Sequence, residues 1–223
     1  MSSRDVILNR IRRALNGSPG ASDGPGGSGA PGAEEPVDRS YLTEHGARST
    51  EETVELLAEN LADYRAIVHR SDADGLAELL ARLLAVRGAR SVVVPPGLDA
   101  SWLKAADPVR VHDRAELTPQ QLDEVDSVVT GCAVAVAETG TIVLDGSPDQ
   151  GRRRSTLVPD HHICVVRVPD QVVSSVPQAL QRLDPVRPLT WISGPSATSD
   201  IELDRVEGVH GPRTLEVVLL SGA

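Results

Sequence analysis

The stretch Ala137-Glu-Thr-Gly-Thr-Ile-Val-Leu-Asp145 decides the fold expected for this chain. Within it an apolar strand pattern, Thr141–Leu144, follows a carboxylate and a glycine. Downstream, the cationic run 152–154 leads into Leu157-Val-Pro-Asp-His-His-Ile-Cys-Val-Val166, where a second strand pattern follows the polar cluster 160–162. Polar groups therefore gather where strands begin. This arrangement predicts a sheet with a polar seam along its strand ends.

Strand patterns alternate with helix patterns along most of the chain. Apolar residues at helical spacing predict helices over 50–64, 72–87 and 171–183, with shorter ones over 98–105 and from Thr118. Short apolar runs predict strands over 66–69, 91–95, 109–112, 127–130, 141–144, 163–168, 189–193 and 215–220. Most of these strands are apolar throughout, which is typical of strands buried on both faces. We therefore predict an α/β fold with a mainly parallel sheet covered by helices on both faces.

The chain divides into three parts by composition. Residues 1–16 predict a basic amphipathic helix, residues 17–36 are dominated by Gly, Pro and Ser, and residues 37–223 carry the α/β pattern. We expect the first helix to dock on its own domain or on a second subunit, attached through a flexible linker. A partner groove or an anionic membrane surface is the alternative.

Composition excludes several classes of protein. The 223-residue chain is 40% hydrophobic, contains no Phe and carries a formal net charge of -10, which disfavours nucleic-acid binding. No apolar run approaches the roughly 20 residues of a membrane span, and no signal-peptide pattern begins the chain. We therefore expect a cytoplasmic protein. Cys132 and Cys164 lie in apolar runs and should behave as small hydrophobic residues. Two cysteines cannot supply the four thiolates of an iron–sulfur cluster, so we expect no such cofactor in this chain.

The loop Gly194-Pro-Ser-Ala-Thr-Ser-Asp-Ile-Glu202 is a candidate anion site. Its small residues allow close backbone approach, and a helix starting near Ser196 would direct N–H groups at a phosphate or carboxylate. The alternative is an ordinary helix start in which Asp200 and Glu202 serve the first turn. Neither a Walker nor a Rossmann glycine pattern occurs in the chain.

Two residues are candidates for acid–base chemistry. Glu138 precedes a glycine turn at a strand edge, where a carboxylate can act as general base or nucleophile; the alternative is a solvated loop charge. His161 is a candidate acid, base or hydrogen-bonding residue. Adjacent histidines on a strand point to opposite faces, so His161 and His162 should not both join one cluster.

Two further roles are metal binding by histidines and aspartates and anion binding by the arginine run. His161, His210 and nearby aspartates could form a metal site, but no metal-ligand spacing is present, and we expect no metal. Arg153 and its two neighbours could clamp an anion, although a charge run in a loop is more often simply solvated. Neither a Gly-x-Ser-x-Gly elbow nor an arrangement typical of a hydrolase triad occurs.

Four motifs follow one another in the second half of the chain: Val134-Ala-Val-Ala-Glu-Thr-Gly-Thr-Ile-Val-Leu144, Leu157–Val166, Trp191–Glu202 and Gly208-Val-His-Gly-Pro-Arg-Thr-Leu215. In this order they resemble the lactate-utilisation protein C family (LUD domain, LutC/YkgG type). The resemblance is dense over about the last hundred residues and looser from about Val37.

This resemblance implies a fold, a role and a set of site positions. The fold would be that of ribose-5-phosphate isomerase, glucosamine-6-phosphate deaminase and the coenzyme A transferases (NagB/RpiA/CoA-transferase-like). The role would be in oxidation of L-lactate to pyruvate, beside partner proteins that carry the iron–sulfur clusters. The signature positions are Glu138, Thr139, Gly140, Pro159, His161, Ser193, Gly194, Ser196, Asp200, Glu202, His210 and Gly211.

From these we take Glu138 and His161 as candidate catalytic residues. The candidate substrate- or anion-binding residues are Thr139, Gly140, Arg153, Ser193, Gly194, Ser196, Thr198, Asp200 and His210. The sequence leaves two alternatives open. One is a stand-alone transferase- or isomerase-like enzyme acting on a phosphorylated or acyl-CoA substrate, and the other is a metal-dependent hydrolase. A small carboxylate or phosphate ligand and a homo-oligomer are both compatible with the pattern.

Overall fold

A computed structural model describes residues 42–43, 45–196 and 211–222. The chain separates into two compact units, 1–40 and 41–223, and all described residues belong to the second. The expected helix over 1–16 and the linker over 17–36 therefore lie outside the described residues. So do the candidate site residues Thr198, Asp200 and His210.

The larger of two sheets is entirely parallel. Among the described residues it has six strands, in the order β1-β10-β7-β4-β2-β3. Their bounds are Ile67–Asp72 (β1), Ser91–Val94 (β2), Val109–His112 (β3), Ser127–Thr130 (β4), His161–Val168 (β7) and Thr214–Ser221 (β10). The prediction of a mainly parallel sheet in an α/β fold is confirmed for this part of the molecule.

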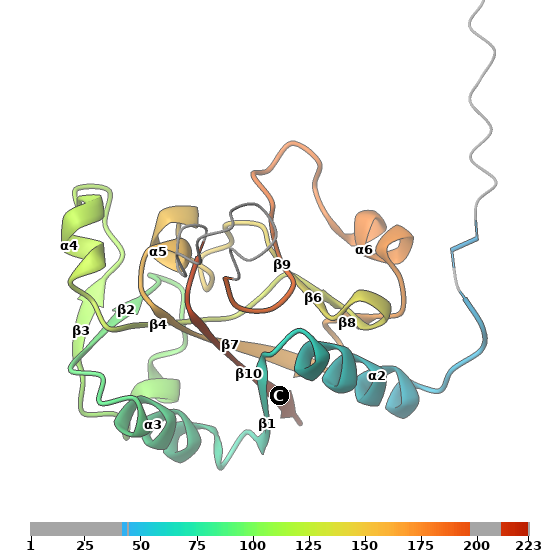
Figure 1. Ribbon diagram of the computed structural model, residues 1–223, viewed down its shortest axis with the longest axis horizontal. Helices are drawn as coiled ribbons and strands as arrows, with labels where there is room; N and C mark the ends of the chain where they lie inside the picture. Colours follow the sequence, from blue (N-terminus) through green and yellow to red (C-terminus); the bar gives the residue numbers. More distant parts are fainter. Residues whose placement is uncertain (1–41, 44, 197–210, 223) are drawn as a thin grey trace, which may run out of the picture. The chain divides into compact units, whose positions relative to one another are not determined.

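A second, smaller sheet is mixed. It has the order β8-β5-β6-β9, with bounds Val172–Val173 (β8), Val134–Val136 (β5), Thr141–Leu144 (β6) and Thr190–Ile192 (β9). β5 pairs parallel with β8, whereas β6 pairs antiparallel with both β5 and β9. Figure 1 shows β6, β8 and β9 gathered beside α6 (Val176–Arg182), apart from α3 (Leu76–Val86).

The second sheet corrects one expectation. The strands over 141–144 and 163–168 were expected in a single sheet, but β6 and β7 lie in different ones. The reason is the short connection from β5 to β6, which is the 3₁₀ turn η2 (Ala137–Thr139) closed by Gly140 at φ 55°. A parallel crossover needs a dozen or more residues, so this connection permits only a hairpin.

The large sheet is covered on both faces. On one face, here called the α3 face, α3 and the turn η1 (Ala100–Leu103) pack on Val92, Ile163 and Val218. On the other, the α2 face, α2 (Thr50–Asp63) and the small sheet pack on Cys164 and Val217. Cys132 and Cys164 are free thiols buried within that second core.

Two helix boundaries differ from expectation. β1 continues to Asp72, whose carboxylate accepts a hydrogen bond from the Gly75 amide, so α3 begins at Leu76 rather than at residue 72. The range 171–183 is not one helix: it holds β8 and then α6, whose first turn contains Pro177. Proline lacks the N–H that continues a helix but fits its first turn, which explains the late start. Two further short helices among the described residues are α4 (Pro119–Asp123) and α5 (Arg153–Leu157).

Candidate functional site

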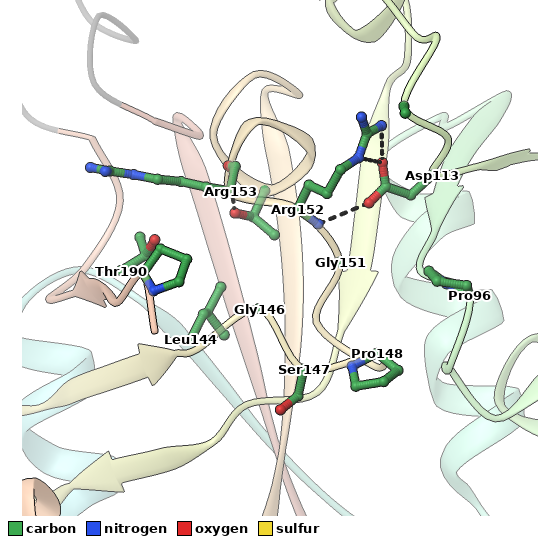
Figure 2. Close-up of a pocket in the computed structure, with 13 residues that line it drawn as sticks. Pro96, Asp113, Leu144, Gly146, Ser147, Pro148, Gly151, Arg152, Arg153 and Thr190 are labelled. Atoms are coloured by element: carbon green, nitrogen blue, oxygen red, sulfur yellow. Dashed lines mark hydrogen bonds and ion pairs between the residues drawn. The ribbon is translucent and has the colours of Figure 1, made fainter. Parts of the chain in front are cut away.

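A cavity of about 440 Å³ lies beyond the carboxyl ends of β2 and β3 (Figure 2). Its walls come from the residues after these strands, from the loop after β6 and from α5. The lining residues are Pro96, Asp113, Ala115, Leu144, Gly146, Ser147, Pro148, Gly151, Arg152, Arg153, Thr156, Pro188 and Thr190. From β2 the chain moves outward to β3 and then returns past β2 to β4, so the winding direction reverses beside this cavity. Ligands in open α/β sheets bind at such reversal points, outside the carboxyl ends of the strands.

The loop over 145–151 is seated against the ends of β2 and β4. The Gly97 amide donates to the Pro148 carbonyl at 2.9 Å, and the Gly131 amide donates to the Asp149 carbonyl at 3.0 Å. A Cβ at Gly97 would lie 2.4 Å from the Pro148 side chain, so only glycine allows this approach. The buried Gln150 side chain accepts from the Asp145 amide at 2.6 Å and braces the loop from inside. The loop that lines the cavity is therefore fixed by two main-chain hydrogen bonds and by the Gln150 side chain.

Asp113, directly after β3, anchors α5 beside the cavity. Its carboxylate accepts from the Arg152 amide and the Arg152 Nε at 2.8 Å, and from the Ser155 hydroxyl at 2.6 Å. Burial alone would raise the pKa of Asp113, but these hydrogen bonds outweigh it and hold the pKa below its usual value. The carboxylate is thus ionised at neutral pH and fixes the start of α5.

Arg153 is the one member of the arginine run without a side-chain partner in the described part of the chain. Arg152 binds Asp113, and Arg154 donates to the Ala115 carbonyl. Figure 2 shows the Arg153 side chain extending away from the Arg152–Asp113 pair. Its exposed guanidinium lines the 440 Å³ cavity and also an adjoining one of about 360 Å³.

This arrangement suits an anion. A guanidinium presents paired donors that match a carboxylate or a phosphate, and no carboxylate among the described residues pairs with Arg153. Beside it, Leu144, Pro96 and Pro188 supply apolar wall, while the Ser147 and Thr190 side chains supply hydroxyl groups. The site can therefore hold a ligand that has one anionic end and a small apolar part.

The second cavity is lined in part by the start of the loop that follows β9. It is lined by Ser193, Gly194 and Ser196, and it shares Arg153 and Thr190 with the first cavity. Packing requires a glycine at position 194, because a Cβ there would lie 2.2 Å from the Tyr64 carbonyl oxygen. The structure thus brings four of the expected anion-binding residues, Arg153 among them, to one region.

Glu138, Thr139 and Gly140 lie elsewhere, at the η2 turn against α2. Glu138 is paired with His45 at 3.0 Å and with Arg48 at 3.1 Å, and it lines neither cavity. The Thr139 hydroxyl donates to Thr141, whose hydroxyl is 2.8 Å from that of Ser193. Gly140 packs against the α2 backbone, where a Cβ would lie 2.7 Å from Asn60. These three residues support the turn, and a catalytic role for Glu138 stays a prediction.

His161 begins β7 at the opposite end of the large sheet, on its α3 face. It contacts Ser127 and Glu216, whereas the adjacent His162 contacts Thr130 on the other face. The expectation that the two histidines diverge is confirmed. Burial and the nearby His161 lower the pKa of His162 to about 3, so His162 is neutral. The structure does not bring Glu138 and His161 together, because their partners belong to different faces of the sheet.

Asp113 and the loop over 145–151 were not selected from the sequence as part of the site. A signal existed for each: Asp113 directly follows a strand pattern, and Gly146-Ser-Pro-Asp-Gln-Gly151 is a turn-rich run that follows another.

Within the residues that the structure describes, no group of three or more His, Cys, Asp or Glu side chains could hold a metal ion. In the same residues, no helix is both long and apolar enough to cross a membrane.

The fold and cavity define an α/β protein with a crevice at the carboxyl ends of a parallel sheet. Comparison with known families places it further: residues 47–220 match the LUD domain, and the chain belongs to that family. The resemblance seen in the sequence is thereby confirmed.

Individual relatives agree with this placement. The chain is 47% identical over 176 residues to lactate utilization protein C of Deinococcus radiodurans, covering 77% of this chain and 81% of that one. It is 28% identical over 246 residues to lactate utilization protein C of Bacillus subtilis, covering 99% and 97%. A crystal structure of a DUF162 family protein from Deinococcus radiodurans superposes with a TM-score of 0.68 at 40% identity, covering 78% of this chain and 99% of that one.

Proposed function

We propose that this protein is a cytoplasmic component of L-lactate utilisation that binds a small carboxylate at Arg153 and works with iron–sulfur partner proteins. The observation that carries the proposal is the 47% identity to a lactate utilization protein C over most of both chains. The cavity supports it chemically, because lactate and pyruvate each combine one carboxylate with one methyl group.

Each part of such a ligand has a counterpart on the cavity wall. The carboxylate accepts two hydrogen bonds from the Arg153 guanidinium, and the methyl group contacts the apolar side chains of Leu144 and Pro188. The remaining oxygen, a hydroxyl in lactate and a carbonyl in pyruvate, meets the hydroxyl of Thr190 or Ser147. This assignment gives Arg153 most of the binding energy.

Electron balance requires an acceptor, and the family resemblance implies that iron–sulfur partner proteins provide it. Oxidation of lactate to pyruvate removes two electrons and two protons, which must pass to a carrier. The two cysteines of this chain are too few for an iron–sulfur cluster, and both are buried. We therefore assign electron transfer to proteins that supply the clusters, with this chain as the accessory subunit.

The proposal is tested by deleting the gene and supplying it again. Loss of growth on L-lactate, rescue by the wild type, and copurification of iron–sulfur proteins with a tagged chain are expected. Rescue by Arg153→Ala should be weak, whereas Arg82→Ala, an exposed arginine on α3, should rescue fully. Normal growth of the deletion strain together with copurification of no iron–sulfur protein contradicts the proposal.

Cavity size favours a second candidate, a transferase- or isomerase-like enzyme on a NagB/RpiA/CoA-transferase-like fold. Ligand cavities of roughly 300–1,000 Å³ are typical of drug-sized molecules. The cavity of about 440 Å³ adjoins another of about 360 Å³ at Arg153, which leaves room for a phosphorylated or acyl-CoA substrate. The sequence assigns Glu138 as the base or nucleophile of this candidate, and since Glu138 lines neither cavity, the substrate would have to extend past them to the η2 turn. Under this assignment Glu138→Gln should abolish turnover while the fold stays intact.

A thermal-shift screen separates the two candidates. A ligand that binds only the native state raises the melting temperature. A shift with lactate or pyruvate alone supports the first candidate. A shift with sugar phosphates or coenzyme A, lost in Arg153→Ala, supports the second. Turnover that is unchanged in Glu138→Gln excludes Glu138 from the reaction.

A further inference from the structure

A chain of three polar side chains crosses the α3 face near the amino ends of β4, β7 and β10. Ser127 and His161 are direct register partners on neighbouring strands, and Glu216 lies on the next strand. The Ser127 Oγ is 2.8 Å from His161 Nδ1, and His161 Nε2 is 3.2 Å from a Glu216 carboxylate oxygen. Nothing in the proposed lactate role uses these residues.

The carboxylate fixes the direction of the hydrogen bonds. An ionised carboxylate only accepts, so the His161 Nε2 must carry a proton and donate it to Glu216. In a neutral imidazole the other nitrogen, Nδ1, is then an acceptor. With the imidazole neutral, Ser127 donates its hydroxyl proton to His161, which is the orientation that a base needs in order to activate a serine.

Glu216 is held in its ionised form. Burial raises the pKa of Glu216, but hydrogen bonds from His161, Arg87 and His69 outweigh burial and lower its pKa to about 2. Arg87 Nε donates to the same oxygen as His161 at 3.1 Å, and His69 Nε2 lies 2.6 Å from the other. The carboxylate thus keeps its charge and orientation at any physiological pH.

A cavity of about 320 Å³ opens beside this chain of side chains. Ser127, His161 and Thr214 line it together with two arginines, Arg87 and Arg213, and with Asp123, Asp126 and Asp160. Ser127 is fully covered and His161 is only 5% exposed, so proton exchange between them is shielded from bulk water. The exposed ion pair of Arg213 and Asp160 lies on the cavity wall at 3.1 Å.

We propose that Ser127 is the nucleophile of a second site, with His161 as its base and Glu216 as the carboxylate that orients the base. The volume and the charged walls suit a short, polar acyl ester rather than a long apolar chain. Because Ser127 is covered, an ester reaches its Oγ from the cavity after side-chain movement at the wall, and the reaction is slow compared with that of an exposed serine.

The reaction balances as ester plus water giving acid plus alcohol. The Ser127 Oγ forms a bond to the ester carbonyl carbon, and the bond from that carbon to the alcohol oxygen breaks. The Ser127 proton moves to His161 Nδ1 and then to the departing alkoxide. Water next attacks the acyl-serine, giving its proton to His161, and the acid leaves as Ser127 recovers its proton.

The test is covalent labelling of the full-length protein with a fluorophosphonate, followed by intact mass and peptide mapping. One equivalent attached at Ser127 is expected in the wild type. Labelling should be absent in Ser127→Ala and about 100-fold slower or more in His161→Gln, the loss expected for a general base. Ser175→Ala removes an equally buried serine that caps α6 and should label like the wild type.

The position of the adduct in the wild-type protein tests the assignment of Ser127 even if a variant fails to fold. Absence of any adduct after prolonged incubation overturns it, and so does an adduct at another residue. Circular dichroism and melting temperature of Ser127→Ala separate loss of the nucleophile from loss of the fold. Labelling that persists in a folded Ser127→Ala also overturns it.

Discussion

The two ends of the large parallel sheet handle charge in different ways. At the amino end, the buried charged group is a strand side chain, Glu216, which is 3% exposed and surrounded by donors from three other parts of the chain. At the carboxyl end, Asp113 follows β3 and binds Arg152, while Arg153, the first residue of α5, has no side-chain partner among the described residues. A charge buried within a strand must be fully paired, whereas an exposed charge at a helix start can remain open to a ligand.

The sharpest test of this contrast is neutralisation of Glu216. Glu216→Gln leaves His69, Arg87 and His161 around a group without charge, and breaking a buried ion pair in this way destabilises by about 3–5 kcal/mol. Urea unfolding at pH 7 measures the change. Glu78→Gln, at an exposed position on α3, should stay within about 0.5 kcal/mol of the wild type. If both substitutions changed the unfolding free energy equally, Glu216 would not be a buried, fully paired charge.

The same carboxylate predicts a pH dependence of stability. The pKa of Glu216 falls from 4.5 to about 2 on folding, so its contribution is present above the unfolded value and is lost as pH falls through the folded one. The shift corresponds to about 3 kcal/mol, lost between about pH 4.5 and pH 2. Urea midpoints across this range should fall more steeply for the wild type than for Glu216→Gln. If the urea midpoints of the two proteins fell in parallel as the pH was lowered, the contacts of Glu216 would not lower its pKa on folding.

At the carboxyl end, Asp113→Asn should have a smaller effect. The substitution keeps the shape but weakens the charge-assisted bonds to Arg152 and Ser155, for an expected loss of about 2 kcal/mol. It should also weaken ligand binding, because α5 carries Arg153. Asp107→Asn, an exposed position, provides the charge-matched control. Unchanged stability and unchanged affinity would mean that Asp113 does not anchor α5.

The two glycines under the loop should differ from each other. Gly97→Ala places a Cβ 2.4 Å from a proline side chain and 2.7 Å from its backbone, and such overpacking typically destabilises by about 1–3 kcal/mol. Gly131→Ala meets mainly the end of the Asp149 side chain at 2.3 Å, which can rotate away. Thermal melts of both variants should rank Gly97→Ala as the less stable. The reverse order would place the tight contact at β4 instead of β2.

Sequence patterns predicted most of the large sheet because its strands are apolar runs bounded by turn residues. The runs over 109–112 and 127–130 became β3 and β4 with the expected bounds. Two strands of the small sheet, β6 and β9, correspond to the predicted runs over 141–144 and 189–193, whereas the other two escaped prediction for a physical reason. β5 and β8 are only three and two residues long, too short for a periodic pattern, and their pairing is decided by tertiary contact.

The candidate site was predicted only in part for a related reason. Arg153 and Ser193 could be selected one at a time as residue types that suit anions. Their sharing of one region depends on how β9 and α5 are placed, which no local pattern contains. The contacts among Ser127, His161 and Glu216 span 34 and 55 residues of sequence, so only the register of three strands reveals them.

The most direct test of the account is isothermal titration of pyruvate and L-lactate into the wild type, Arg153→Ala and Arg82→Ala. The account predicts binding to the wild type and to Arg82→Ala. Removal of the charged donor should weaken binding to Arg153→Ala by about 10–100-fold, with the unfolding free energy nearly unchanged. Equal affinity for all three proteins, or no binding by the wild type at millimolar ligand, would contradict the claim that the carboxyl-end cavity is a carboxylate site.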